Sequence, residues 1–239
     1  GNQSTKIRRK YKDVVTAFDI ETTALHNIEQ SIMYVWMFQI GVDNDTIIGR
    51  TWEDLLYTLN EISQQLEDDE WIVIYVHNLS YEFQFLRGIY DFKPEEVFAV
   101  DRRKVLKCEM MNHFEFRCSY LHSNMSLAEY TKKMKVEHVK LSGDDFDYNK
   151  IRYPWTELSD EELAYCTHDV IGLVEAITKE MEYDDDNLYS IPLTSTGYVR
   201  RDAKKAMRKV NSGFVKDQLP NFHVYSMLRE AFRGGDTHA

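Results

Sequence analysis

The sequence lacks several features that would place it in a common class of protein. Its three cysteines, Cys108, Cys118 and Cys166, are too few and too scattered for a disulfide framework or a zinc site. Hydrophobic runs never approach the roughly 20 residues that cross a bilayer, and we expect no secretory signal in the polar, basic start of the chain. We therefore expect a protein of a reducing, intracellular compartment that has no membrane partner.

Positive charge is also scarce, because 29 lysines and arginines stand against 40 acidic residues, which gives a net charge of -11. That balance argues against a large generic surface for nucleic acid. It does not exclude a nucleic-acid enzyme with a metal-holding carboxylate cluster, since cations there offset much of the phosphate charge. The 239 residues are enough for one large domain, or for one domain with an appendage.

Strand-like and helical patterns alternate along the chain. We expect strands at 14–18, 32–42, 46–48 and 71–76, a strand-like region at 96–121 and a polar loop at 143–153. We expect one helix from a Thr51 N-cap to Leu66, and a second helix that follows the segment 77–80 and ends at Tyr90. Ser126 and Ser159 each stand three residues before a glutamate, the spacing of a capping box, and open helices to Met134 and to about Met181.

This order of elements predicts an α/β domain at 1–190, built on one mixed sheet. The remainder, 191–239, reads as two appended helices. The first carries a basic stripe from Arg200 to Lys209, opposite an apolar line of Val199, Ala203, Ala206 and Val210. The stripe is either a solvated face or a surface that meets the DNA backbone or a further domain, and phosphate contacts there would make binding sensitive to salt.

Two carboxylates stand side by side in the first strand region. Asp19 and Glu21 follow the apolar run that ends at Phe18, and side chains two apart on a strand point the same way. Carboxylates fixed so closely repel each other unless they are neutralised, commonly by a hard divalent cation. A polar strand end is the alternative.

A tyrosine and an aspartate share one face of the long helix. Tyr165 and Asp169 are four residues apart, and Gly172 and Ala176 continue their face. We expect these small residues to leave room for a substrate or a metal. An aspartate on such a crowded stripe is uncommon without a partner, although an ordinary polar edge is the alternative.

A third polar group, 77–82, lies where a buried strand gives way to a helix. Strand ends of this kind commonly line the active crevice of an α/β sheet. The alternative is a helix cap from Asn78 or Ser80, with Glu82 as a first-turn carboxylate that favours the helix dipole.

Together and in this order, the three groups resemble the motifs of the DEDD exonucleases. The motifs read Phe18-Asp19-Ile20-Glu21-Thr22, then Asn78-Leu79-Ser80-Tyr81-Glu82, then Tyr165 with Asp169. A tyrosine four residues before the last aspartate indicates the tyrosine subclass, whereas His168 is in the wrong place for the histidine subclass. The resemblance narrows to the family B DNA polymerases of protein-primed phages, and it extends to the aromatic-Arg-Gly-Gly segment at 232–235.

The resemblance implies an RNase H-like fold with a central mixed sheet flanked by helices, plus a C-terminal helical extension. It implies a proofreading 3′→5′ exonuclease that uses two divalent cations, Mg²⁺ or Mn²⁺, about 4 Å apart. The implied metal ligands are Asp19, Glu21, Glu82 and Asp169. Tyr165 would orient the attacking water, because an unperturbed tyrosine is a poor base at neutral pH. A lysine would contact the scissile phosphate, and Lys140 is favoured over Lys150.

The resemblance also implies contacts with the 3′ end of single-stranded DNA. The matching positions are Thr22, Asn78, Tyr81 and Ser119, with His77 and Tyr148 as weaker candidates. Tyr81 would stack on the terminal bases, a contact that tolerates any sequence. The chain resembles the exonuclease portion of a longer polymerase, so the implied partners include a polymerase domain of the same parent chain and a terminal protein. The implied location is the cytoplasm of an infected bacterial host.

Glu82 departs from the family pattern, which usually has an aspartate at that position. Its longer side chain reaches a metal from a different backbone position, so the second cation could bind more weakly. One alternative function is therefore a single-strand-binding module of the same fold without catalysis. Another is a nuclease of the same superfamily that acts on RNA.

Overall fold

The fold is organised around one mixed sheet of eight strands. The computed structural model describes residues 8–23, 31–101 and 103–211. The strand order is β4-β3-β2-β5-β8-β7-β6, and β1 pairs with the start of β5. The neighbours β2, β5 and β8 run parallel, whereas β3, β4, β6 and β7 pair antiparallel. The strands are β1 (Lys10–Tyr11), β2 (Thr16–Thr23), β3 (Ile32–Ile40), β4 (Ile47–Gly49), β5 (Glu70–Val76), β6 (Val97–Asp101), β7 (Lys104–Met110) and β8 (Phe114–Cys118).

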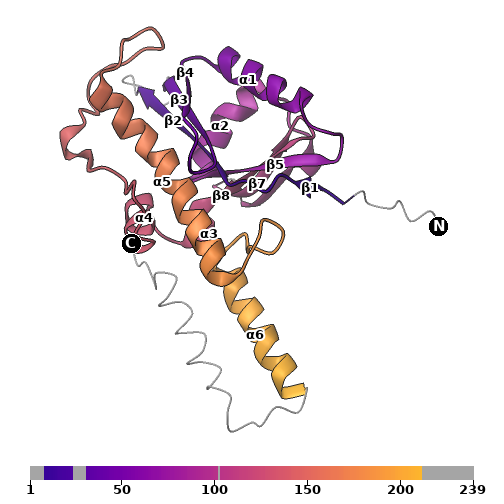
Figure 1. Ribbon diagram of the computed structural model, residues 1–239. Coiled ribbons are helices and arrows are strands. Elements are labelled where there is room, and N and C mark those ends of the chain that lie inside the picture. Colours follow the sequence, from indigo (N-terminus) through magenta and orange to yellow (C-terminus); the bar gives the residue numbers. More distant parts are fainter. Residues whose placement is uncertain (1–7, 24–30, 102, 212–239) are drawn as a thin grey trace.

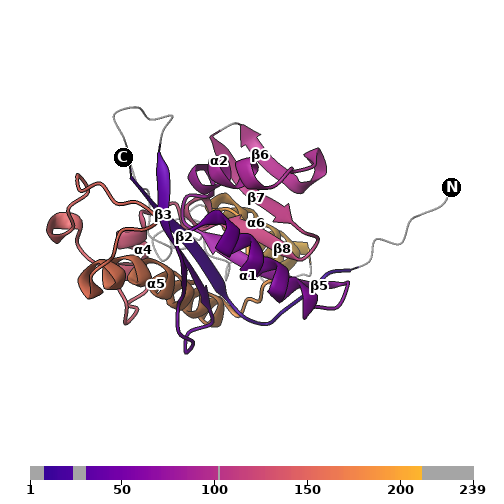
Figure 2. The ribbon, with the colours of Figure 1, turned by 90° about the horizontal axis from the view of Figure 1, so that it is seen from above.

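Helices cover both faces of this sheet (Figures 1 and 2). The helices are α1 (Trp52–Gln64), α2 (Leu79–Ile89), α3 (Ser119–Ser123), α4 (Leu127–Lys133), α5 (Asp160–Asp184) and α6 (Ser195–Asn211). Phe18 and Ile20 of β2 belong to the core under α1 and α2, whereas Ala17 belongs to the core under α5. Because side chains alternate along a strand, Asp19 and Glu21 share the side of Ala17 and face α5. The expected α/β architecture is confirmed.

Three helices begin where the sequence predicts a cap. The hydroxyl of Thr51 accepts a hydrogen bond from the Asp54 amide at 3.1 Å, and that of Ser126 accepts one from the Glu129 amide at 3.2 Å. Ser159 and Glu162 form a reciprocal capping box, with bonds of 3.1 and 3.0 Å, at the start of α5. These caps fix the start of the helix that later carries Tyr165 and Asp169.

Some predicted boundaries are wrong. The first strand carries Asp19 and Glu21 as expected, but it begins at Thr16 rather than at residue 14 and runs to Thr23, with a shift of register after Glu21. The region 96–121 holds three strands, and its last part, from Ser119, is helical. Over so short a run the sequence pattern does not separate a strand from a helix. The second appended helix and the segment 232–235 lie outside the described residues.

The stripe of small residues on α5 does not leave room for a substrate or a metal. A Cβ atom on Gly172 would lie 2.1 Å from the carbonyl oxygen of His138, and Ala176 is fully buried in the core. The segment after α4 therefore lies directly against the helix, and Gly172 is what permits that approach. This close backbone contact replaces the open groove that we expected from the sequence.

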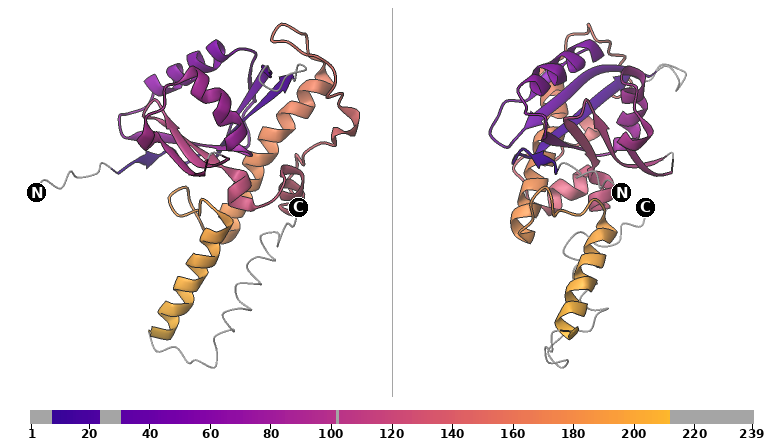
Figure 3. Two further views of the ribbon diagram at one scale, coloured as in Figure 1. Left: turned by 180° about the vertical axis from the view of Figure 1, so that it is seen from behind. Right: turned by 90° about the vertical axis from the view of Figure 1, so that its right-hand side faces the viewer.

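The helix α6 extends away from the sheet, as Figures 1 and 3 show. Its buried residues are Tyr198 and Asp202 rather than the expected apolar line, whose last member, Val210, is exposed. Arg201 Nη1 binds Asp186 Oδ1 at 2.6 Å and so ties α6 to the end of α5. The other cations of the basic stripe are exposed, namely Arg200, Lys204, Lys205, Arg208 and Lys209. Among the described residues, no helix is both long and apolar enough to span a membrane.

We predict that Gly172→Ala lowers the free energy of unfolding by about 1–3 kcal/mol, because the new methyl group meets a backbone oxygen that cannot rotate away. Gly88→Ala is the matched control, since a Cβ there has open space and alanine favours a helix by about 1 kcal/mol. Urea denaturation measures both. If Gly172→Ala raised the free energy of unfolding as much as Gly88→Ala, the close approach of the His138 carbonyl would not depend on a glycine at position 172.

Candidate metal centre

Three carboxylates from two distant parts of the chain meet between β2 and α5. Asp19 and Glu21 lie on β2, and Asp169 lies on α5. Each offers one oxygen, and these three oxygens all lie within 4.8 Å of one another. The structure therefore brings the first and third sequence motifs together at one point.

Glu82 joins this group from α2. It lies in the first turn of that helix, is 4% exposed and shares a hydrogen bond with Asp19. Its Oε2 atom is buried without a hydrogen-bond partner among the described residues. The side chain of Glu82 thus contacts the group by its hydrogen bond with Asp19, and its Oε2 atom remains available to bind a ligand.

Crowding and burial raise the pKa of every carboxyl in the group. Burial, aided by Glu21, Asp169 and Glu82, raises the pKa of Asp19 well above its usual value. Burial and Asp169 raise the pKa of Glu21 to about 7, although Lys140 opposes the shift. Burial raises the pKa of Glu82 to about 8 and also raises the pKa of Asp169. Without a cation, ionisation of all four carboxyl groups has a high free-energy cost.

The residues fit a hard divalent cation. All four side chains offer carboxylate oxygens, the ligands that Mg²⁺ and Mn²⁺ prefer. A cation would relieve the repulsion that raises their pKa values, and it would give the buried Glu82 Oε2 a partner. Asp19, Glu21 and Asp169 are therefore the first candidate ligands, with Glu82 beside them.

Lys140 is the lysine that reaches this centre. Its Nζ lies 2.9 Å from Asp169 Oδ1, and the Lys140 amide donates to Thr131 Oγ1 at 3.1 Å. Burial lowers the pKa of Lys140, but Asp169, Asp19 and Glu21 together outweigh burial, so the pKa is raised. Lys150 instead lies near Glu162, at 3.6 Å. The geometry thus favours Lys140 over its competitor.

Tyr165 lies buried among aromatic and cationic neighbours. The ring of Phe146 stacks on it, with centroids 4.3 Å apart, and Lys140 Nζ lies 5.0 Å from its ring centroid. Its hydroxyl forms a hydrogen bond with that of Tyr148, which is 61% exposed. Tyr148, a weaker candidate in the sequence, is therefore a direct neighbour of Tyr165.

Two of the expected strand contacts touch each other next to the carboxylates. Thr22 Oγ1 and Tyr81 Oη lie 2.5 Å apart. Asn78 occupies the N-cap position of α2, yet its exposed side chain makes no capping hydrogen bond. Ser80 accepts a hydrogen bond from the Val105 amide at 2.9 Å. Neither residue therefore acts as the side-chain cap of α2 that was the alternative explanation.

His77 and Ser119 form a supporting pair rather than an open surface. His77 Nε2 donates to the Met125 carbonyl at 2.9 Å, so His77 Nδ1 accepts from the Ser119 hydroxyl at 3.0 Å. Burial lowers the pKa of His77 to about 4, and Ser119 is fully buried. Their assigned contacts with a DNA strand stay predictions, because in this structure both polar groups bind the protein itself.

Sequence reasoning missed Arg152 and Phe146. Arg152 is 3% exposed, its carbonyl and amide both bond Thr23 Oγ1, and its guanidinium pairs with Glu162 and lies 4.4 Å from the Phe146 ring centroid. This arginine therefore fixes the 146–153 segment against the end of β2. The sequence around them shows only aromatic residues that alternate with acidic ones, which we interpreted as a polar loop, and no spacing links Arg152 to Thr23 or Phe146 to Tyr165.

The fold matches solved structures of Phi29 DNA polymerase. The complex of that polymerase with single-stranded DNA matches at a TM-score of 0.65 and 14% identity, over 84% of this chain and 36% of the polymerase. Its ternary complex with primer-template DNA and incoming nucleotides matches at a TM-score of 0.60 and 13% identity, over 92% of this chain and 39% of the polymerase. The chain thus spans well under half the length of these proteins.

Sequence comparisons add nothing to this likeness, since no protein-family model and no curated protein matches the chain. At such low identity the structural likeness establishes the fold alone. At the level of the fold, the likeness confirms the RNase H-like arrangement of a central mixed sheet flanked by helices that we expected from the sequence.

The raised pKa values predict an unusual dependence of stability on pH. Because the folded protein holds protons on Glu21 and Glu82 that the unfolded chain releases near pH 4.5, the metal-free protein should lose stability as pH rises from about 4.5 to about 8. Glu82→Gln should flatten this decline, and Mg²⁺ should reverse it at high pH. Thermal unfolding at several pH values measures this, with the exposed Glu61→Gln as control. A decline unchanged by Glu82→Gln would contradict the assignment.

Proposed function

We propose that this chain is a metal-dependent 3′→5′ exonuclease that removes nucleotides from single-stranded DNA ends, as the proofreading part of a phage family B DNA polymerase. The observation that carries the proposal is the meeting of Asp19, Glu21 and Asp169, with oxygens within 4.8 Å, where Lys140 and Tyr165 also converge. The likeness to a phage polymerase solved with single-stranded DNA supports it. Such an enzyme would act in the cytoplasm of an infected host.

In this proposal, each residue has a task at the scissile phosphate. Asp19, Glu21 and Asp169 would hold two cations, with Glu82 beside them, and bound cations would supply an activated water and stabilisation of the charge on the phosphate and the departing 3′ oxygen. Lys140 places its positive charge where the phosphate oxygens gather. Tyr165 orients the attacking water through its hydroxyl, which Tyr148 holds from the exposed side. The products are 5′-mononucleotides.

The DNA strand would enter beside β2 and the start of α2. Thr22 and Tyr81 already touch, so the Tyr81 ring is positioned next to the carboxylates. An aromatic face contributes about 1–3 kcal/mol per stacked base and accepts any base, which suits an enzyme that edits every sequence. The exposed side chain of Asn78 lies at the same edge and can bind the strand.

A second candidate function, a non-catalytic single-strand-binding module, rests on Glu82. Glu82 is not one of the three residues at this centre whose oxygens lie mutually within 4.8 Å, and it reaches them through Asp19. If Glu82 does not reach the cation directly, the cation would support binding of the DNA strand but not its hydrolysis. Glu82→Asp would then restore release of nucleotides.

End-labelled single-stranded DNA, incubated with the protein and Mg²⁺ or Mn²⁺, tests both functions. We expect stepwise shortening from the 3′ end, and a loss of at least about 100-fold for Asp19→Ala with Glu21→Ala, since the cations lose two ligands. A matched RNA strand should be degraded more slowly. Binding without shortening under either cation would favour the second function, and unchanged shortening by the double variant would refute the site.

Substitution of the two lysines separates their roles. Lys140→Ala should lower kcat by about 10²–10³-fold with a small effect on strand affinity, because its charge acts on the phosphate that reacts. Lys150→Ala is the matched control and should stay within about twofold of the parent, since Lys150 lies 3.6 Å from Glu162 and is half exposed. Single-turnover kinetics with excess enzyme measures both. Equal losses would contradict the choice of Lys140.

A further inference from the structure

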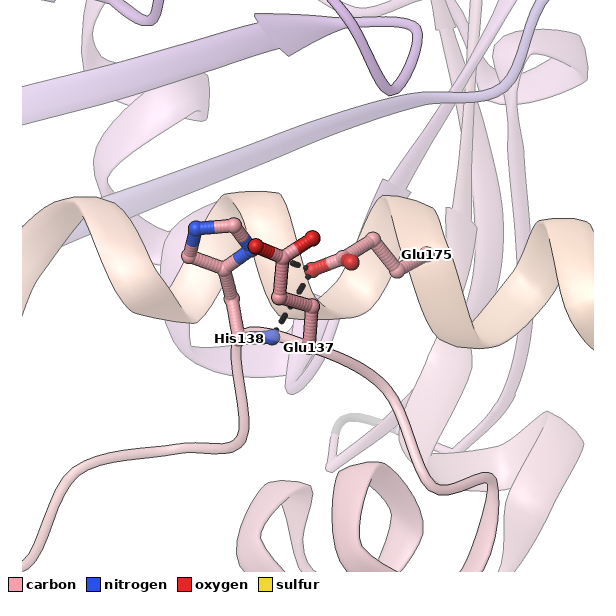
Figure 4. A group of neighbouring side chains, drawn as sticks. All are labelled: Glu137, His138 and Glu175. Atoms are coloured by element: carbon pink, nitrogen blue, oxygen red, sulfur yellow. Dashed lines mark hydrogen bonds and ion pairs between the residues drawn. The ribbon is translucent and has the colours of Figure 1, made fainter.

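A second group of metal-binding side chains lies on the outer side of α5, away from the carboxylates of β2. Figure 4 shows Glu137 and His138 of the segment after α4 beside Glu175 of α5. One donor atom from each residue lies within 4.8 Å of the others. This group shares no residue with the candidate exonuclease centre, so it needs its own explanation.

The group is built on a rigid support. The carbonyl of His138 lies directly over Gly172, where any side chain would collide with it. Glu175 lies one turn further along the same helix and is 9% exposed. Its Oε1 accepts hydrogen bonds from the His138 amide at 3.1 Å and from His138 Nδ1 at 2.8 Å. Two of the three donors are therefore held in place, and only the exposed Glu137 has to adjust.

The charges of the group are incompletely compensated. In the described part of the chain, the only ion pair of Glu175 is with His138, and Glu137 forms none. The one lysine of α5, Lys179, instead binds the carbonyls of Met134 and Lys135. A second imidazole, His168, borders the group, with its ring centroid 5.1 Å from that of His138. Two carboxylates and an imidazole thus gather without a lysine or arginine partner from the described segments of the chain.

We propose that Glu137, His138 and Glu175 bind a transition-metal ion of the Zn²⁺ type. Imidazole nitrogen with carboxylate oxygen is a donor set that suits Zn²⁺, whereas Mg²⁺ prefers oxygen alone. Ligand bonds of about 2.0–2.2 Å place adjacent donors roughly 3.0–3.5 Å apart, close to the 2.8 Å between His138 Nδ1 and Glu175. Binding moves the imidazole proton from Nδ1 to Nε2, so the ring stays neutral, and water fills the remaining position.

This site would act on the segment that carries Lys140. His138 lies two residues before Lys140, whose amide is held by Thr131. A cation that links the segment to Glu175 would tie it to α5 on one side, while Lys140 reaches Asp169 of the same helix on the other. The inference goes beyond the proposed function and does not depend on it, since the ligands and the metal class both differ.

Zinc titration of the metal-free chain tests the proposal. Calorimetry should find a Zn²⁺ ion that still binds after Asp19→Asn with Asp169→Asn, a background in which the other centre is lost. In that background Glu175→Gln and Glu137→Gln should each weaken binding by at least about tenfold. Glu182→Gln, an exposed change on the same helix, should have no effect. X-ray absorption of bound zinc should show imidazole scattering that His138→Gln removes.

The variants also separate misfolding from loss of the site. Glu137 is exposed, so its substitution leaves the core untouched even if Glu175→Gln loosens α5. Circular dichroism confirms that each variant is folded. The proposal would be overturned if Glu137→Gln and Glu175→Gln left the affinity for zinc unchanged. It would also be overturned if Asp19→Asn with Asp169→Asn abolished zinc binding entirely. In either case the group would only join the segment after α4 to α5 through hydrogen bonds. Either result is independent of whether the chain degrades DNA.

Discussion

The repulsion among crowded, partly buried carboxylates is the constraint on which the rest of the molecule depends. Asp19, Glu21 and Asp169 are forced together because β2 and α5 pack face to face, and burial keeps water from separating their charges. The fold tolerates this arrangement because hydrophobic burial around it is extensive, from Ala17 beneath to Cys166 and Val170 on the helix. A stable core thus supports a site that is unfavourable without ligand, as is common at functional centres.

Several independent contacts fix the helix that bears one side of this site. The capping box of Ser159 and Glu162 sets where α5 begins, and Glu162 also pairs with the buried Arg152. Further along, Gly172 receives the segment that precedes Lys140. The same helix therefore determines the position of Asp169 and of the lysine that contacts it. Geometry at the centre follows from how α5 is anchored rather than from any single bond within it.

The sequence predicted which of these side chains lie together better than it predicted the edges of the strands and helices that carry them. Asp19, Glu21, Tyr165 and Asp169 were recognisable because spacing on a strand or helix decides which side chains share a face. Arg152 and Phe146 were not, since their partners Thr23 and Tyr165 are distant in sequence and no local period links them. The groove expected at Gly172 was wrong for the same reason, because what fills it is a backbone segment more than thirty residues away.

The junction between α5 and α6 has a mechanical consequence. The buried contacts of α6 lie near its start, at Tyr198 and at the Arg201–Asp186 pair, whereas its later residues, from Met207 to Val210, are exposed. A helix of 17 residues is about 25 Å long. About ten of these residues lie beyond Arg201 and extend roughly 15 Å, so a tilt of about 10° at that contact moves the far end by roughly 3 Å. Small rearrangements around Asp186 therefore produce larger displacements at the far end of α6.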